Sequence, residues 1–404
     1  MHAMSLVEEE LGGPTVFRDL AKLDFDYVPD NLPGREEAIR FLTSTYRGLT
    51  QGAAREHALL WGPVGTGKTA VAKRFVRDFA AVLRKQGKAL ESVHVNCRSR
   101  KSDGLAMLGI LNHFDPHYPD RGFSVGEMLR DLKRHLERKG VHLLVILDEV
   151  DALLKSDGSS LVYDLTRFNS ESGPSWAGVS VIMVSQDNVL PLLDAAALST
   201  FKQTNAYQFT KYQSPNLEAI VKQRVELAFN PGAVEPDTVT LVADIAAVEG
   251  NARLAIEVLQ KSGSIADDEG KGRVGPEEVR AAKANVSSYI TTPKLLAMAK
   301  HPLLVLLALA RRLKHGDAYA TTGSVEAAYK VACEEFGETA RAHTQFWKYL
   351  KQLEGAGFLL SRLSGKGQAG TTQMLSIPDA PAKVVEAKVH ELLGRGGSLP
   401  PDTA

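Results

Sequence analysis

One stretch near the start of the chain has the residue types and spacing of a phosphate-binding loop. Residues 62–69 begin with a glycine, continue through four residues and end in Gly67, Lys68 and Thr69. The glycines let the backbone approach phosphates with its N–H groups pointing inward, and a following helix adds the positive end of its dipole. Lys68 is expected to reach the β- and γ-phosphates, and Thr69 to ligate Mg²⁺. The stretch therefore predicts a nucleotide site.

Two further stretches carry polar groups at the ends of apolar runs. Residues 143–147 are apolar and are followed directly by Asp148 and Glu149, which is typical of a central strand that ends beside a phosphate loop. Asp148 is predicted to hold Mg²⁺, and Glu149 to orient and deprotonate the attacking water. The apolar run 179–184 leads to Gln186, whose amide is the candidate for contact with the γ-phosphate or the water.

The elements that must position these groups follow from the hydrophobic pattern. Strands are predicted at residues 58–61, 93–96, 142–147 and 179–184, with helical patterns between them. This alternation favours an α/β fold, in which a parallel sheet is covered by helices on both faces. After about Asn205 the strand patterns stop, and helices predicted at residues 216–227, 236–248, 252–262 and 276–284 form a helical lid.

The last part of the chain has the pattern of a winged helix. Helices are predicted at residues 303–314, 325–335 and 344–354, followed by a strand at 358–363, a glycine-rich turn at 365–370 and a strand at 373–377. We therefore predict three domains. They are a nucleotide-binding base with an N-terminal arm that lacks strong periodicity (1–205), a lid (206–290) and a winged-helix DNA-binding domain (291–404).

Composition limits the classes of protein that fit. A chain of 404 residues is too long for one core, and its 48 basic and 48 acidic residues cancel, so any DNA contact needs a local basic face. Cys97 and Cys333 lie in different predicted domains and form neither a disulfide framework nor a metal pattern. The apolar run 303–310 is too short to span a bilayer, and the acidic start at residues 8–10 does not resemble a signal peptide. We expect a cytoplasmic, nucleoid-associated protein without membrane contact.

Three residues of the predicted lid region are candidates for contact with the nucleotide. Asn251 is a plausible N-cap, and Arg253, one turn into its helix, is placed to fold over the phosphates when a lid closes. Tyr212 is a candidate for stacking on adenine, and Arg224 follows it at a helix length. As isolated residues they also fit a core aromatic side chain and surface arginines.

Taken together, the motifs resemble those of archaeal Orc1/Cdc6 replication-initiation proteins. The resemblance rests on their order and spacing along almost the whole chain. Its residues are 31–36, 62–69, 96–98, 147–151, Tyr212, Arg224, 228–232 and 250–253. It implies an AAA+ ATPase whose phosphate-binding residues are Val64, Gly65, Thr66, Gly67, Lys68 and Thr69. It also implies that Tyr212 and Arg224 bind the nucleotide and that Arg253 is sensor 2.

The resemblance further implies ligands and partners. The ligands are ATP or ADP with Mg²⁺ held by Thr69 and Asp148, and the catalytic set is Glu149, Lys68, Gln186 and Arg253. The partners are double-stranded origin DNA, the replicative helicase (MCM) and other initiator subunits. Residues 105–121 correspond to an insertion that adds DNA contacts in this family, with Arg98, Arg100 and Lys101 just ahead of it.

The chain departs from the family pattern at two places. Gln186 stands where relatives usually have asparagine, and alanines around Ala196 stand where relatives commonly place an arginine that acts in trans. Loss of such an arginine can slow hydrolysis by several orders of magnitude. We therefore expect either slow, unassisted hydrolysis or assistance from another residue or a partner subunit.

The predicted helix 344–354 has the pattern of a DNA recognition helix. Its apolar side would pack into the domain, leaving the polar side for a major groove. The predicted DNA-binding residues are Thr344, Gln345, Lys348 and Lys351 on this helix, with Arg341, Arg362 and the wing residue Lys366 nearby. A winged helix also serves as a protein docking module, so the pattern alone leaves that alternative open.

These observations support two hypotheses about the function of the whole chain. In the first it is an ATP-dependent replication initiator with slow Mg²⁺-dependent hydrolysis as a switch. In the second it is a paralogous, sequence-specific DNA-binding regulator that holds ATP or ADP as a structural ligand. An AAA+ transposition or partition ATPase is disfavoured, because such proteins do not generally combine the motif at residues 31–36 with a lid and a winged helix.

Overall fold

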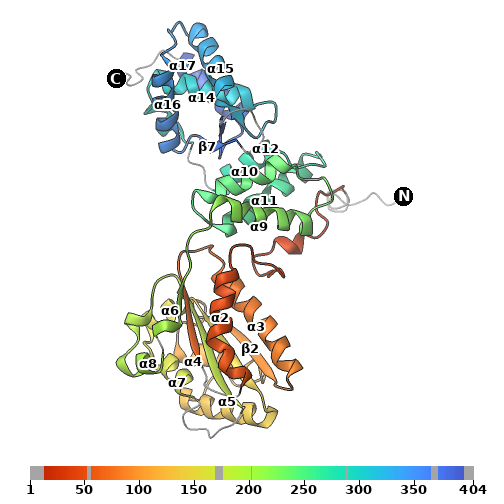
Figure 1. Cartoon of the computed structure of the whole chain (residues 1–404), viewed down its shortest axis with the longest axis vertical. Helices are drawn as coiled ribbons and strands as arrows, with labels where there is room; N and C mark the ends of the chain where they lie inside the picture. The colour runs from red at the N-terminus through yellow and green to blue at the C-terminus, as the bar shows by residue number, and fades with distance from the viewer. Residues whose placement is uncertain are drawn as a thin grey trace, which may run out of the picture. The chain divides into compact units, whose positions relative to one another are not determined.

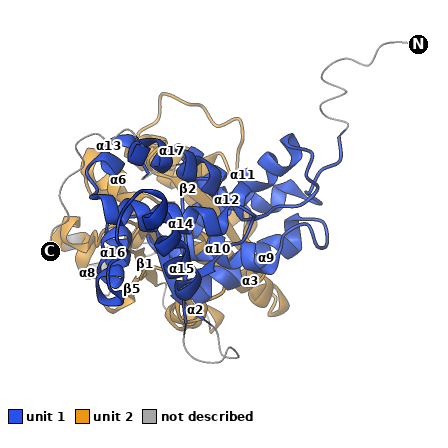
Figure 2. Cartoon of the chain, turned by 90° about the horizontal axis from the view of Figure 1, so that it is seen from above, with its two compact units in different colours: residues 1–27, 213–404 blue, residues 28–212 orange. Residues whose placement is uncertain are grey.

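The computed structural model describes residues 13–51, 56–168, 176–201, 203–286, 290–364 and 372–394. Contacts within the chain divide it into two compact units, which Figure 2 distinguishes by colour. One unit comprises residues 28–212, and the other comprises residues 1–27 and 213–404.

The unit of residues 28–212 is built on a five-stranded parallel sheet with the strand order β2-β3-β4-β1-β5. Its strands are β1 (His57–Trp61), β2 (Leu90–Asn96), β3 (His142–Asp148), β4 (Gly178–Ser185) and β5 (Ala206–Gln208). All residues of β3 and β4 are buried, as expected of strands covered on both faces. The predicted α/β fold is confirmed, but the prediction that strands stop after about Asn205 is wrong, because β5 follows at Ala206–Gln208 and is too short to show a period.

Helices cover both faces of this sheet (Figure 1). One face packs against α2 (Glu36–Thr50) and α3 (Lys68–Lys85). The other packs against α4 (Asp103–Leu111), α5 (Val125–Lys139), α6 (Val150–Ser156), α7 (Ser160–Arg167) and α8 (Ala195–Thr200). Successive residues of a strand point to opposite faces, so Leu59 and Leu60 of β1 belong to the two different cores. Short 3₁₀ segments, η2 (Leu190–Leu192) and η3 (Gln203–Asn205), connect the last elements.

The other unit begins with a helical lid. It contains η1 (Leu20–Leu23), α9 (Ser214–Ala228), α10 (Pro236–Ala247), α11 (Ala252–Asp268) and α12 (Pro276–Val286). The segment 13–27 is fixed on these helices, because the Asp267 carboxylate accepts hydrogen bonds from the Val16 amide and the Thr15 hydroxyl at 2.7 and 2.6 Å. Phe17 packs on Phe229 with ring centroids 4.8 Å apart. Part of the arm without strong sequence periodicity is therefore ordered, and its contacts are with the lid.

The remaining elements form the winged helix. Its helices are α13 (Thr292–Leu296), α14 (Lys300–Leu313), α15 (Thr322–Glu335), α16 (His343–Gly355) and α17 (Ala382–Gly394). The strands β6 (Ala320–Thr321), β7 (Leu360–Leu363) and β8 (Gln373–Ser376) form an antiparallel sheet in the order β6-β8-β7. The sequence prediction of three helices and a hairpin is confirmed in outline, but it missed β6, α13 and α17. A two-residue strand is too short to show a period.

A buried arginine joins the lid to the winged helix. Arg280 of α12 has no exposed surface, and its guanidinium donates hydrogen bonds to the carbonyls of Ile377 and Ala318 at 3.1 and 3.0 Å and to the Ser376 hydroxyl at 3.2 Å. Glu277, one turn earlier, pairs with Arg280 and accepts a hydrogen bond from the Ala382 amide. The two modules of this unit therefore share a hydrogen-bonded interior.

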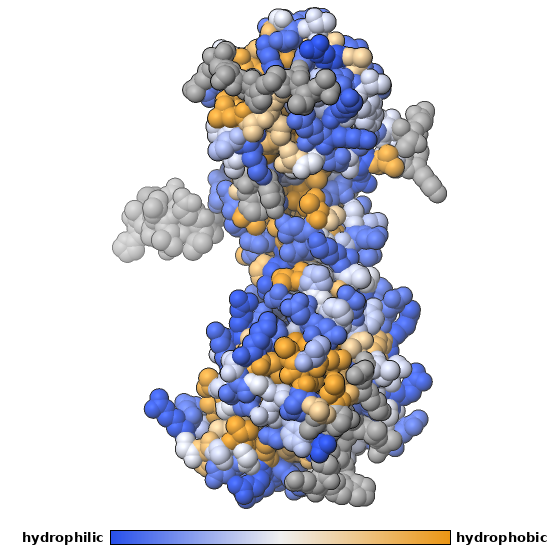
Figure 3. Space-filling view, turned by 90° about the vertical axis from the view of Figure 1, so that its left-hand side faces the viewer, coloured by the Kyte–Doolittle hydropathy of each residue, from blue (hydrophilic) through white to orange (hydrophobic). Residues whose placement is uncertain are grey.

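Figure 3 shows one face of the molecule. Hydrophilic residues are spread over both units, with smaller hydrophobic patches among these residues. Within the part of the chain that the structure describes, no helix is long and apolar enough to cross a membrane.

Candidate nucleotide site and DNA-reading surface

The predicted phosphate loop lies between β1 and α3, where its glycines adopt conformations that other residues avoid. Gly65 and Gly67 have φ values of 74° and 84°, in the left-handed region that favours glycine. Gly62 has a φ of 143°, and a Cβ at this position would lie 2.3 Å from the carbonyl oxygen of Phe209. The loop is therefore built around glycine at these three positions, as its spacing predicts.

Lys68, at the start of α3, is folded back on the loop. Its ammonium donates hydrogen bonds to the carbonyls of Gly62 and Pro63 at 2.6 and 2.8 Å. Burial lowers the pKa of Lys68 to about 8, and the carboxylates of Asp148, Asp151 and Glu149 oppose this shift. A partly desolvated cation held against loop carbonyls is suited to bind phosphate oxygens, which are stronger acceptors.

Two oxygen-bearing side chains, predicted to hold Mg²⁺, meet where β3 ends beside α3. The Thr69 hydroxyl donates a hydrogen bond to the Asp148 carboxylate at 2.9 Å, and His94 of β2 hydrogen-bonds to the same carboxylate oxygen at 3.0 Å. Burial raises the pKa of Asp148, but the hydrogen bonds from His94 and Thr69 outweigh it and hold the pKa below its usual range. An ionised carboxylate with a hydroxyl fits Mg²⁺, which uses one or two carboxylates together with substrate phosphates.

The candidate base Glu149 follows directly and has an unusual backbone. Its φ is 52°, and it is the only residue other than glycine with positive φ in the described ranges. Such a conformation costs of the order of 1–3 kcal/mol and clusters at functional sites. The Glu149 carboxylate is about one-third exposed and lies 3.7 Å from the Arg98 guanidinium. The sequence pattern gave no role to His94 and singled out Arg98 only for DNA, although His94 lies two residues before the motif at residues 96–98 and Arg98 is the last residue of that motif.

Gln186 lies at the same edge of the sheet. The Gln186 carbonyl accepts a hydrogen bond from the Gly62 amide at 3.2 Å. Gln186 follows the last residue of β4 and is exposed. Ser185 pairs in register with Trp61 of β1, and its hydroxyl donates to Asp151 at 3.3 Å. The structure thus brings Gln186 to the phosphate loop, as the sequence predicts, and its contact with a nucleotide stays a prediction.

The three predicted nucleotide contacts around the lid have different surroundings. Tyr212 is buried in the unit of residues 28–212, and the guanidinium of Arg35 lies 3.6 Å from the centre of its ring. Arg224, in the other unit, is buried and donates hydrogen bonds to the carbonyls of Lys22 and Tyr27. The contacts of Arg224 therefore hold the N-terminal segment on the lid, and its role as a direct nucleotide ligand stays a prediction.

Arg253 is exposed at the start of α11. Asn251 caps this helix, as predicted, because its side chain accepts hydrogen bonds from the amides of Arg253 and Leu254. The Arg253 guanidinium lies 4.8 Å from the centre of the Phe25 ring. A charged, exposed side chain at a helix start is available for phosphate contact, and the sensor 2 role stays a prediction.

The predicted recognition helix is α16, and its two faces are arranged as the sequence pattern requires. Its buried residues are Phe346, Tyr349, Leu350 and Leu353. Thr344, Lys348 and Lys351 are exposed, and Gln345 is half-buried. The polar face is therefore free of the domain core and available to a groove, while Lys366 lies outside the described residues.

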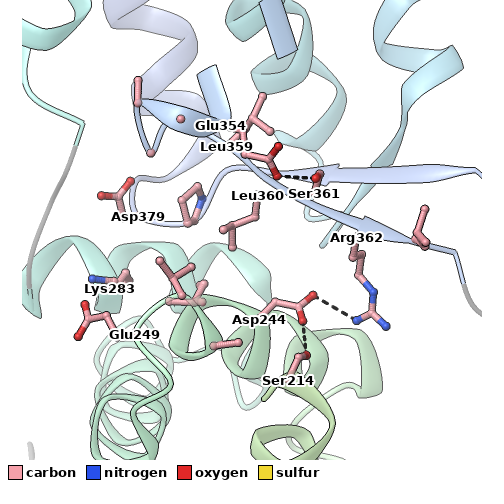
Figure 4. A pocket seen from close by; sticks show the side chains of 18 of the residues that line it. Ser214, Asp244, Glu249, Lys283, Glu354, Leu359, Leu360, Ser361, Arg362 and Asp379 are labelled. Carbon is pink, nitrogen blue, oxygen red and sulfur yellow. Dashed lines mark hydrogen bonds and ion pairs between the residues drawn. The ribbon is translucent and has the colours of Figure 1, made fainter. Parts of the chain in front are cut away.

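The two arginines predicted to flank the recognition helix have partners within the protein. The Arg341 side chain donates a hydrogen bond to His301 at 3.1 Å. Arg362 of β7 forms an ion pair with Asp244 of the lid helix α10 at 3.2 Å, at the edge of a cavity of about 930 Å³ between lid and winged helix (Figure 4). Asp244 also accepts hydrogen bonds from Ser214 at 2.6 Å and from Tyr319 at 2.7 Å. A DNA contact by Arg362, which stays a prediction, would therefore compete with its ion pair to Asp244.

The predicted DNA-contacting insertion is largely interior where it forms α4. Residues 106–111 of this helix are buried in the core beneath the sheet. The following residues are exposed at His113, His117 and Arg121. DNA contacts by this insertion, which stay a prediction, would fall mainly to residues 113–121 rather than to the buried part of α4.

Comparison with known proteins places the chain in a family. Three family models match: an AAA domain over residues 52–193, the Cdc6 AAA+ ATPase-type lid domain over residues 218–284, and the C-terminal winged-helix domain of CDC6 over residues 294–387. The chain is 32% identical to the ORC1-type DNA replication protein 2 of Sulfurisphaera tokodaii, with 92% of each chain covered.

Two solved structures are similar over nearly the whole chain. The crystal structure of Cdc6p from Pyrobaculum aerophilum has a TM-score of 0.81 at 26% identity, covering 94% of this chain and 99% of that one. The Aeropyrum pernix Orc1 protein, solved in complex with DNA, has a TM-score of 0.61 at 32% identity, covering 93% and 97%. These three relatives are archaeal. With its phosphate loop, lid and winged helix, the chain belongs to the Orc1/Cdc6 family of AAA+ replication initiators.

Proposed function

We propose that this protein is an ATP-dependent initiator that binds origin DNA through its winged helix and AAA+ insertion and helps to recruit or load the replicative helicase. The observation that carries the proposal is the exposed polar face of α16, with Lys348 and Lys351, in a chain that also holds the Thr69–Asp148 pair beside a phosphate loop. The Aeropyrum pernix relative solved with DNA supports it.

The chemistry of ATP follows from the residues at the edge of the sheet. Lys68 would exchange the carbonyls of Gly62 and Pro63 for the β- and γ-phosphate oxygens. Thr69 and Asp148 would hold Mg²⁺, which neutralises phosphate charge when bound. Glu149 would orient the attacking water and accept its proton, and Gln186 would contact the water or the γ-phosphate. Arg253 would meet the phosphates from the lid.

We further propose that hydrolysis is slow and serves as a switch. Residues 195–197 at the start of α8 are all alanine, so this segment offers no cation to a neighbouring site, and arginine fingers supply large rate factors in related chemistry. ATP would then persist long enough to define a DNA-bound state, and hydrolysis would end it.

Footprinting tests the proposal on DNA from the genomic neighbourhood of the chain's own gene. We expect a discrete protected site with ATP, and weaker or altered protection with ADP. The variant carrying Lys348→Ala and Lys351→Ala should lose the footprint while still binding ATP. A footprint that this variant retains in full would contradict DNA reading by α16.

The alternative function, a DNA-binding regulator with a structural nucleotide, is favoured by the same alanines and by Gln186. Single-turnover hydrolysis measured with and without DNA separates the two proposals. A structural nucleotide would survive both conditions unchanged, whereas the initiator should convert its ATP to ADP within a measurable time.

A further inference from the structure

Arg35 connects three segments of the AAA+ unit that are distant in sequence. It is the residue immediately before α2 and is 8% exposed. Its Nε donates a hydrogen bond to the Thr66 carbonyl of the phosphate loop at 2.8 Å, its Nη2 to the Thr210 carbonyl at 3.0 Å, and its Nη1 to the Gly34 carbonyl at 2.9 Å. All three nitrogens of the guanidinium therefore have acceptors in the main chain.

An aromatic ring closes this arrangement at the point where the chain leaves the unit. The Arg35 guanidinium lies 3.6 Å from the centre of the Tyr212 ring, and Tyr212 is the last residue of the unit. The Tyr212 hydroxyl lies against the phosphate loop, since a Cβ on Gly67 would come within 2.7 Å of it. Tyr212 thus contacts both Arg35 and the loop.

The cost of burying Arg35 points to a positional role. Desolvating a guanidinium is unfavourable unless it is well paired, and the hydrogen bonds that the described part of the chain offers to Arg35 come from main-chain carbonyls. A planar fork can reach several carbonyls in fixed directions and stack on a ring at the same time, whereas an ammonium is a point charge. An apolar side chain would fill the same space without holding these segments in register.

We propose that Arg35 is a positioning residue that fixes the phosphate loop against the segment leading into the lid. Through this contact, the effect of nucleotide binding at the loop is transmitted to Tyr212. This inference rests on the proposed function, because it requires that the loop binds ATP. Arg35 does not touch the phosphates in this arrangement, and its action is through Thr66 and Tyr212. Tyr212 accordingly connects the phosphate loop to the segment that leaves the AAA+ unit.

Amide hydrogen exchange across residues 210–217 tests the communication. In the unmodified protein, saturating ATP with Mg²⁺ should slow exchange in this segment at least about fivefold, the lower end of typical coupling between sites. Arg35→Lys keeps the charge but loses the fork, so at saturating ATP it should lose most of this protection. Tyr212→Leu, which leaves the Arg35–Thr66 contact intact, should lose the same protection when it is measured at an ATP concentration that saturates the variant.

Controls make each outcome decisive. Arg40→Lys changes an exposed arginine on α2 and should behave like the unmodified protein, and thermal melting should show that all variants are folded. Full protection in Arg35→Lys would overturn the proposal, because charge alone would then suffice. Full protection in Tyr212→Leu would overturn it as well. If the unmodified protein did not bind ATP at all, the proposed function would fail instead.

Discussion

The Thr69 hydroxyl donates a hydrogen bond to the Asp148 carboxylate at 2.9 Å although 79 residues separate the two in sequence. The contact exists because β1 and β3 end at the same edge of a parallel sheet, with β4 between them. It places a hydroxyl and an ionised carboxylate beside the loop that carries Lys68, and Glu149 follows in the chain.

Glu149→Gln should bind ATP normally and lose turnover, because an amide retains the size of the side chain but cannot accept a proton. General-base catalysis contributes about 10²–10⁴-fold, so the rate should fall by about this factor. Filter binding and phosphate release measure the two properties separately. Lys68→Ala should lose ATP binding itself, whereas Glu137→Gln on the exposed side of α5 should change neither. Equal turnover in Glu149→Gln and the unmodified protein would disprove the assigned base.

Gly62→Ala should destabilise the AAA+ unit strongly. The added Cβ would lie 2.3 Å from the Phe209 carbonyl oxygen, and that residue is tied to the sheet because its amide bonds to the Trp61 carbonyl at 2.7 Å. We expect a loss of about 3 kcal/mol or more in the free energy of unfolding, the scale of overpacking combined with backbone strain.

Gly104→Ala is the matched control for this change. A Cβ on Gly104 meets no atom within 4 Å, and the residue lies in the first turn of α4. Alanine there should be neutral or stabilise by about 0.4–1 kcal/mol. Urea unfolding of the two variants compares them directly, and similar midpoints would show that the close approach at Gly62 relaxes easily.

Lys348→Ala and Lys351→Ala should each weaken DNA binding and reduce the salt dependence of the affinity. Each phosphate contact contributes about 0.9 to the slope of log K against log salt, so each variant should lower the slope by about this amount. Fluorescence anisotropy at several salt concentrations measures it. Lys330→Ala on α15, also exposed, is the control. A slope that stays unchanged in both α16 variants would place DNA binding elsewhere.

The AAA+ unit should lose stability as pH falls from about 6.5 to 4. Burial lowers the pKa of His57 from 6.5 to about 4, and its ring nitrogen accepts a hydrogen bond from the Val181 amide at 3.2 Å. In this pH window the unfolded chain binds the proton and the folded chain does not, so the free energy of unfolding rises with pH. The contribution of His57 to the free energy of unfolding is fully present above pH 6.5, and its lowered pKa corresponds to about 3 kcal/mol.

A variant that does not titrate isolates this effect. His57→Gln keeps an acceptor and should give a flatter stability profile between pH 4 and 6.5, even if its stability at neutral pH is lower. His117→Gln, at an exposed position, should leave the profile as it is. Urea unfolding across the window measures both, and an unchanged slope in His57→Gln would assign the acid sensitivity to other groups.

The sequence predicts the central strands well and the contacts of the site only in part. The apolar runs that became β3 and β4 are unmistakable because both faces of these strands are buried. The phosphate loop and Asp148 followed from spacing alone. By contrast, Arg35 finds its acceptors 31 and 175 residues away, and main-chain carbonyls leave no mark in a sequence pattern.

Other omissions have simpler causes. Val385, Val389 and Leu393 lie four residues apart and are buried in α17, a helical pattern that the sequence carried but that we did not assign. The ordered segment 13–27 has no period, because single residues such as Val16 and Phe17 anchor it through individual contacts. Hydrophobic periodicity reports regular elements, and segments held residue by residue escape it.

The guanidinium of Arg280 has a consequence for how the protein denatures. Its hydrogen bonds run from α12 to the carbonyls of Ile377 and Ala318, so melting of the winged helix would break these bonds and open an interior that the lid shares with it. Lid and winged helix should therefore lose structure cooperatively. Calorimetry of a chain with three sequence-defined domains is expected to show two heat-absorption peaks rather than three.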